Sequence, residues 1–195
     1  MISHTHQCIF IHINKCAGTS IQSLLKQYGG NFVFKNHQVL KTSHRSHVTA
    51  YQYSNLEYWN RYFKFAVVRN PWDKELSDYF FHNKKQEKHK SFEEYLKRDI
   101  KQEQKIWHTN QIDWLRSSNN NLELDFICRF ETLEQDISKV FKKINITNYT
   151  LEKLNTTSHK HYSHYYNPEL IEIVNNLYSK DIEYFDYQFY KSNNE

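Results

Sequence analysis

The chain has 195 residues, a formal net charge of +4 and an aromatic content of 16%. This length predicts a single domain with its own core, and the mild charge without basic clusters argues against a nucleic acid partner. Three cysteines without a CxxC pair, no apolar run of membrane-spanning length and no room for a signal peptide predict a cytoplasmic protein with reduced thiols.

The first predicted element is a strand that starts by Cys8 or Ile9, and a helical pattern follows from Thr19 to about Tyr28. The loop and the helix start offer groups that suit an anion, namely Lys15, Gly18, Thr19 and Ser20. The first N–H groups of a helix have no internal partners and carry partial positive charge, so this order of parts predicts a phosphate site. The alternative is an ordinary strand-to-helix turn capped by a hydroxyl residue.

A second phosphate site is predicted after the apolar run 65–68, which has the pattern of a buried strand. Arg69 follows that strand, and Ser77 lies about one turn inside a helix predicted to begin near Trp72 or Asp73. A guanidinium matches the geometry of a phosphate with two parallel N–H bonds, so arginine and serine together suit this ligand. The alternative is that Arg69 pairs with a carboxylate such as Asp73.

The remaining predicted elements alternate between strands and helices. They are a strand at 32–34, a helix at 55–62, a helix capped by Ser91 that ends near 106, a helix or loop at 108–115, a strand at 125–130, a helix capped by Thr132 that ends near 144, and a helix capped by Asn167 that ends near 178. Strands separated by helices predict an α/β fold with a central, mostly parallel sheet flanked by helices.

The motifs resemble those of the PAPS-dependent carbohydrate sulfotransferases, where PAPS is 3′-phosphoadenosine 5′-phosphosulfate. Four segments are similar to family motifs and stand in the family's order: 15–20, 69–77, 125–136 and 181–187. The first is similar to the 5′-phosphosulfate loop and the second to the 3′-phosphate motif, with the same eight-residue step from arginine to serine. Asn14 stands where the family usually has proline, and Lys74 where it commonly has arginine.

The resemblance implies one P-loop-like, three-layer sandwich domain over residues 1–195, which moves a sulfuryl group from PAPS to an acceptor hydroxyl. The implied acceptor is a carbohydrate, a glycolipid or another glycoconjugate, and no metal is required. Lys15 would stabilise the leaving phosphate in an in-line displacement. The implied cofactor-binding residues are Lys15, Cys16, Ala17, Gly18, Thr19, Ser20, Arg69, Ser77, Ser158 and Lys160.

A general base is needed to take the proton of the acceptor hydroxyl. The resemblance implies a histidine after the second strand, and His47 lies there, between the two phosphate motifs. Histidine suits this task because its ordinary pKa lies near neutral pH. His44, three residues earlier, is the alternative base.

Three further histidines and two other functions are alternatives to this scheme. His159, His161 and His164 have a spacing that suits a metal, but no carboxylate or cysteine completes a ligand set. A P-loop-type nucleotide kinase would require a GK[ST] loop, whereas Lys15 precedes Gly18, so ATP is disfavoured. A catalytically silent glycan- or phosphate-binding module on the same fold is the second alternative.

Overall fold

The computed structural model describes residues 1–28, 47–86, 91–102, 109–151, 154 and 159–192. The chain divides into two compact units. Unit 1 comprises Met1–Val68 and Asp113–Asn155, and unit 2 comprises Arg69–Ile112 and Thr156–Glu195. The predicted strand at 32–34 lies outside the described residues.

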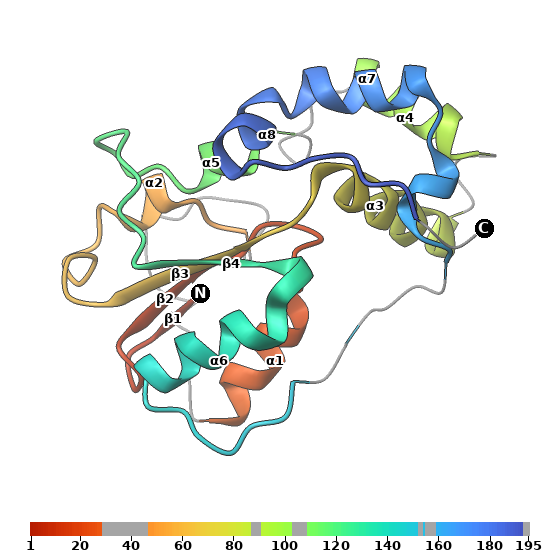
Figure 1. Ribbon diagram of the computed structural model, residues 1–195. Coiled ribbons are helices and arrows are strands. Elements are labelled where there is room, and N and C mark those ends of the chain that lie inside the picture. The colour runs from red at the N-terminus through yellow and green to blue at the C-terminus, as the bar shows by residue number, and fades with distance from the viewer. Residues whose placement is uncertain (29–46, 87–90, 103–108, 152–153, 155–158, 193–195) are drawn as a thin grey trace. The chain divides into compact units, whose positions relative to one another are not determined.

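Unit 1 is built on a four-stranded sheet in the order β1-β2-β3-β4 (Figure 1). The strands are β1 (Ile2–Ser3), β2 (Cys8–Ile11), β3 (Phe63–Val68) and β4 (Phe126–Arg129). β2, β3 and β4 are parallel, and β1 adds a short antiparallel edge. The predicted α/β fold with a mostly parallel sheet is therefore confirmed. β1 was not predicted because two residues are too short to show an alternating pattern.

The parallel register brings the carboxyl ends of three strands to one edge of the sheet. Ile11 pairs with Ala66, and Val68 pairs with Arg129. β3 lies between two parallel neighbours and is buried from Lys64 onward, which explains its unbroken apolar character. The loop that holds Lys15 follows β2 at this edge, where ligands bind in open α/β sheets.

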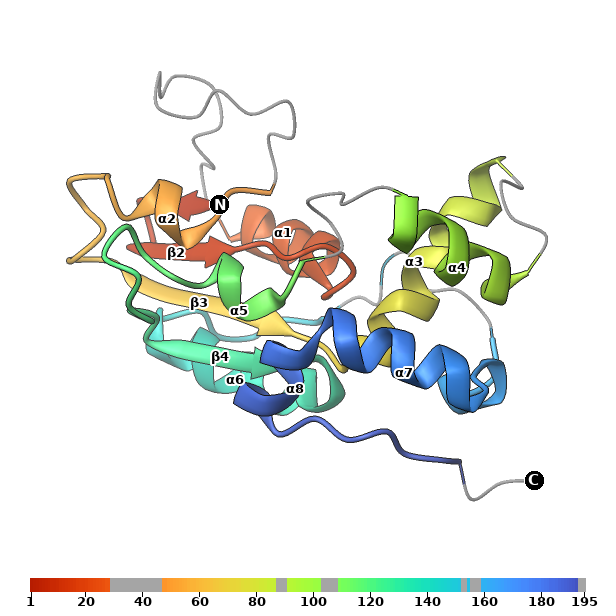
Figure 2. The ribbon, with the colours of Figure 1, turned by 90° about the horizontal axis from the view of Figure 1, so that it is seen from above.

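Helices flank both faces of this sheet. α1 (Gly18–Gln27) and α6 (Leu133–Lys143) cover one face, and the short α2 (Ala50–Tyr53) lies on the other (Figures 1 and 2). α1 buries Ile21, Leu24 and Leu25, which recur at the spacing of one helix face. Each such fully buried side chain contributes about 1.5–3 kcal/mol relative to an exposed one.

Two local predictions in unit 1 were wrong. Residues 55–62 form turns instead of a helix, and the helix in this region is the shorter α2, which begins earlier at a capping box of Thr49 and Gln52. Thr132 is the N-cap residue of α6 but accepts no N–H with its side chain, and its hydroxyl donates to the Asp136 carboxylate at 2.8 Å. α6 itself begins and ends as predicted.

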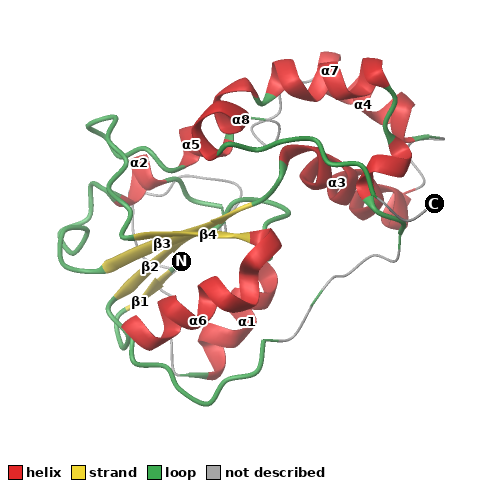
Figure 3. Cartoon of the chain, in the orientation of Figure 1, coloured by secondary structure: helices red, strands yellow, loops and turns green. Residues whose placement is uncertain are grey.

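The regular elements of unit 2, among its described residues, are helices joined by loops, drawn red and green in Figure 3. Its helices are α3 (Pro71–Gln86), α4 (Phe92–Gln102), a 3₁₀ helix at Tyr162–Tyr165, α7 (Pro168–Leu177) and α8 (Ser179–Phe185). α3, α4 and α7 pack against one another. Ser91 and Asn167 accept N–H groups of α4 and α7, as predicted, whereas α8 continues beyond the predicted end of the last helix.

A buried ionic cluster joins the helices of unit 2. Lys74 and Glu75, 1% and 0% exposed, pair at 3.3 Å, and Tyr178 contacts both of them. Tyr95 donates to Glu75 at 3.1 Å and to Asp78 at 3.0 Å. Burial, together with the carboxylates, raises the pKa values of both tyrosines well above their ordinary value, so they stay donors. Lys74 is therefore part of the core of unit 2.

Candidate functional site

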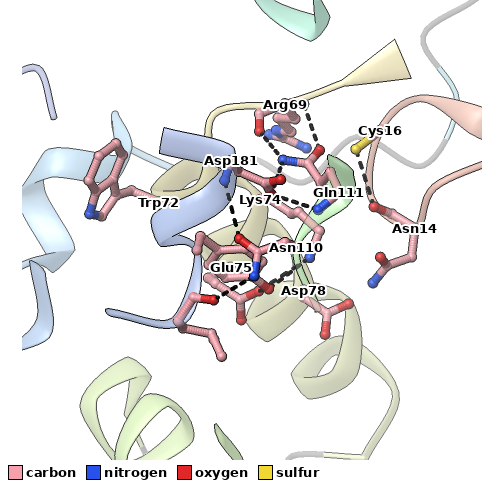
Figure 4. A network of polar contacts seen from close by, with 12 residues as sticks. Asn14, Cys16, Arg69, Trp72, Lys74, Glu75, Asp78, Asn110, Gln111 and Asp181 are labelled. Carbon is pink, nitrogen blue, oxygen red and sulfur yellow. Dashed lines mark hydrogen bonds and ion pairs between the residues drawn. The ribbon is translucent and has the colours of Figure 1, made fainter. Parts of the chain in front are cut away.

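The loop after β2 has an unusual backbone for residues other than glycine. Lys15 and Ala17 both adopt left-handed conformations, with φ angles of 61° and 56°. Each such residue costs about 1–2 kcal/mol, so the folded unit holds the loop in this shape against a local preference. Cys16 lies between them, is buried, and donates its thiol to the carbonyl of Asn14 at 3.3 Å (Figure 4). Left-handed residues interleaved with others turn successive N–H groups toward one concavity, which suits an anion.

The N-terminus of α1 lacks a side-chain cap. Ala17 is the N-cap residue and makes no side-chain hydrogen bond, and the first turn contains no acidic residue. The predicted alternative, a helix capped by Thr19 or Ser20, is wrong because α1 begins at Gly18 and both residues lie in its first turn. Thr19 is exposed, whereas the buried Ser20 hydroxyl accepts the N–H of Leu154 at 3.0 Å. The uncapped helix N-terminus therefore offers the partial positive charge of the helix dipole and main-chain N–H donors to a negative ligand.

Gly18 faces the ring of a buried histidine that sequence reasoning missed. A Cβ atom added at Gly18 would lie 1.7 Å from Nε2 of His12, so no larger residue fits while that ring is in place. The sequence predicts Gly18 for the close approach of an anion, and the structure adds this steric requirement. His12 is 7% exposed, and among the described residues its buried Nδ1 has no hydrogen-bond partner.

His47, the predicted base, packs against His12. Its Nδ1 lies 3.0 Å from the carbonyl oxygen of His12, and the two rings are 4.3 Å apart. A carbonyl oxygen only accepts, so Nδ1 carries the hydrogen and Nε2 is the basic nitrogen of the neutral ring. Trp114, in α5 (Gln111–Trp114), presents its ring edge-on at 6.4 Å from that of His47. The alternative base, His44, lies outside the described residues.

The burial of His12 predicts how the stability of the protein depends on pH. Burial, reinforced by His47, lowers the pKa of His12 to about 3 from 6.5. The unfolded chain takes up a proton that folded His12 rejects, so stability falls as the pH drops below the unfolded value. Between about pH 7 and pH 5 this histidine should cost about 2 kcal/mol of unfolding free energy. Urea unfolding at both pH values measures this effect. The unfolding free energy of His12→Leu should fall less between pH 7 and pH 5 than that of the unmodified protein, by about the same 2 kcal/mol. Equal falls in the two proteins would contradict the prediction.

Arg69 opens unit 2 and is the residue that follows β3 in the chain. Its Nε and Nη2 both lie 2.8 Å from one oxygen of Asp73, so the predicted carboxylate pair is present. This pair does not by itself decide against a phosphate, because a guanidinium carries several N–H donors. Arg69 is 7% exposed, and burying its charge is costly unless a partner compensates it, which the Asp73 carboxylate does.

The main chain of Arg69 is clamped by Gln111. The Gln111 amide accepts the Arg69 N–H at 2.9 Å and donates to the Arg69 carbonyl at 2.8 Å (Figure 4). Asp181 in turn accepts the N–H groups of Gln111 and Ile112, at 2.7 and 2.9 Å. Burial raises the pKa of Asp181, and these hydrogen bonds oppose that rise. The sequence places Gln111 in the predicted helix or loop at 108–115 and Asp181 in the segment 181–187 that is similar to a family motif, but it assigns neither residue a role.

The other predicted site residues are more scattered. Ser77 is half-buried in α3, Lys160 is exposed in unit 2, and Ser158 lies outside the described residues. The ring of His159 stacks on that of Phe80, 5.0 Å away. Over the part of the chain that the structure describes, no group of three or more histidine, cysteine, aspartate or glutamate side chains could hold a metal ion.

The described loop defines a class of protein. It is an α/β protein in which a parallel strand runs through a lysine-bearing loop into an uncapped helix, an arrangement that suits a phosphate or sulfate group. A model described as the sulfotransferase family matches residues 1–188, and the chain belongs to that family. The predicted family is thus confirmed.

Part of the chain is also similar to one curated protein. An uncharacterized protein of Archaeoglobus fulgidus is 32% identical over 106 residues, which make up 52% of this chain and 82% of that protein. No solved structure matches the chain. No helix within the described ranges is both long and apolar enough to cross a membrane.

Proposed function

We propose that this member of the sulfotransferase family transfers a sulfuryl group from PAPS to a hydroxyl group of a carbohydrate or other glycoconjugate. The observation that carries the proposal is the uncapped N-terminus of α1 behind a strained loop that holds Lys15. These groups fit a phosphosulfate because they supply N–H donors, the positive end of the helix dipole and a lysine cation, and the first turn of the helix contains no acidic residue. The proposal requires no metal ion.

The proposed chemistry is an in-line displacement that balances in one step. Nε2 of His47 takes the proton of the acceptor hydroxyl while that oxygen forms a bond to sulfur. Lys15 stabilises the charge that develops on the 5′-phosphate oxygen as its bond to sulfur breaks. The loop from Cys16 to Ser20 holds this phosphate through main-chain and hydroxyl groups. The products are a sulfate ester and 3′-phosphoadenosine 5′-phosphate (PAP).

The 3′-phosphate is assigned to Arg69 and Ser77, which would distinguish PAPS from other adenine nucleotides. Ser158 and Lys160 are proposed as additional contacts to the nucleotide. Residues 1–195 would act as one sulfotransferase domain, and the family match supports this because it spans most of both units.

Transfer of labelled sulfate from PAPS to a panel of saccharides and glycolipids tests the proposal directly. Formation of labelled sulfate ester is the expected result. A protein that binds PAP and transfers nothing would instead be a silent binding module. Thermal stabilisation by magnesium-ATP but not by PAP would favour a nucleotide kinase.

Arg69→Ala should weaken PAP binding about 100-fold, because charge-assisted bonds to the 3′-phosphate are lost. The affinity for AMP, which lacks that phosphate, should change by less than about threefold, and kcat at saturating PAPS should fall much less than the affinity. Isothermal calorimetry with both nucleotides checks this, and Arg61→Ala, at an exposed arginine, is the matched control for lost charge. Equal losses of PAP and AMP affinity would contradict the 3′-phosphate assignment.

A further inference from the structure

We propose that His12 is a positioning residue, which holds the phosphate loop and the base His47 in a fixed relation within unit 1. This role rests on the proposed function, since it concerns the loop and the base assigned there. It adds a residue that no motif of the chain assigned. Three observations carry it: the contact with Gly18, the contact with His47 and the cost of burying the ring.

The first observation is the contact between His12 and Gly18. The ring lies in the space that a side chain at position 18 would need, since an added Cβ would be 1.7 Å from Nε2 and 1.8 Å from Cδ2. Gly18 is the first residue of α1, and its φ is not in the left-handed region. Glycine is therefore required at this point by the ring and not by the backbone conformation. The ring thus sets how closely β2 and the start of α1 approach.

The second observation is the contact between His12 and His47. The carbonyl of His12 receives Nδ1–H of His47 at 3.0 Å, which selects the tautomer with a basic Nε2. The two rings lie 4.3 Å apart and are tilted by 41°. His12 therefore contacts the base His47 with both its main chain and its ring. The same ring also contacts the start of α1, where the phosphate is proposed to bind.

The third observation is the cost of this arrangement. Nδ1 of His12 is buried and has no hydrogen-bond partner among the described residues, which costs about 1–3 kcal/mol. Native proteins leave few such groups, and each calls for an explanation. An apolar side chain would fill the same space without that cost. Packing alone therefore does not account for a histidine at this position, between the phosphate loop and the base.

A double-mutant cycle tests the inference, with Gly18→Ala, His12→Ala and the combined variant. Gly18→Ala alone should lower PAP affinity by at least about tenfold, or about 1.4 kcal/mol, because the added methyl group displaces the ring. In the His12→Ala background the same change should cost less than about twofold, since the obstacle is gone. Calorimetry with PAP and ligand-free melting temperatures measure both effects.

The catalytic part of the inference is measured in His12→Ala alone. Its kcat at saturating PAPS should fall by about tenfold or more, because His47 loses the ring that it packs against, whereas KM for PAPS should change less. A merely structural role would lower the melting temperature and leave the kcat of the folded protein unchanged. The matched control is His6→Ala, at a histidine whose ring contacts the carbonyls of Tyr28 and Ile144. It should keep kcat and should not relieve the effect of Gly18→Ala.

The outcomes separate this inference from the proposed function. An additive cycle, or full kcat in His12→Ala while the unmodified protein transfers sulfate, would overturn the inference and leave the function standing. Absence of sulfate transfer by the unmodified protein would overturn the proposed function and with it the catalytic role of His12. A tight coupling with Gly18 together with a reduced kcat supports the inference.

Discussion

Lys15→Ala should reduce sulfuryl transfer by at least about 1000-fold, or roughly 4 kcal/mol in activation free energy. The amine would act mainly on charge that develops in the transition state, so its loss should appear in kcat more than in PAP affinity. We expect PAP affinity to fall by less than about tenfold, because the main chain and dipole of α1 remain. Labelled sulfate transfer at saturating PAPS and calorimetry with PAP provide the two measurements.

The control for Lys15 is Lys26→Ala, which removes the same charge at the exposed last turn of α1. This variant should retain full kcat. If Lys15→Ala instead kept most of its kcat and lost PAP affinity by a similar factor, the lysine would contribute ground-state binding only, and the assigned role would be wrong.

His47→Ala should lower kcat by about 10²- to 10⁴-fold, the usual contribution of a positioned general base. PAP affinity should stay within about threefold, because the base contacts the acceptor and not the nucleotide. The acid limb of the pH dependence of kcat, which reports deprotonation of the base, should disappear in the variant. Steady-state kinetics between about pH 5 and pH 9 with a saccharide acceptor measure both effects.

Two other histidine variants serve as the control and as the test of the alternative base. His164→Ala, at an exposed histidine of unit 2, should leave kcat and its pH dependence unchanged. His44→Ala tests the alternative base. A loss of kcat in His44→Ala, with full activity in His47→Ala, would transfer the role to the earlier residue.

Local patterns predicted the elements whose signals lie within a few residues. The apolar run before Arg69 became β3, Asn167 accepts the N–H of Leu170 at 2.9 Å, and α1 begins one residue before its predicted start. The same kind of signal failed at Thr132, whose side chain accepts no N–H of α6 and whose hydroxyl donates to the Asp136 carboxylate. A capping pattern gives residue types at a spacing, but it does not specify the orientation that each side chain takes in the folded chain.

The sequence by itself determined the fold class, the family and the loop that carries Lys15, because strand, loop and helix start are contiguous and their spacing is the signal. Only the tertiary structure decided that the ring of His12 fills the space beside Gly18 and that His47, 35 residues away, donates to the carbonyl of His12. It also decided that Gln111 clamps the main chain of Arg69 across 42 residues. Such contacts depend on how strands and helices pack, and the spacing of residues along the chain does not specify which distant side chains meet.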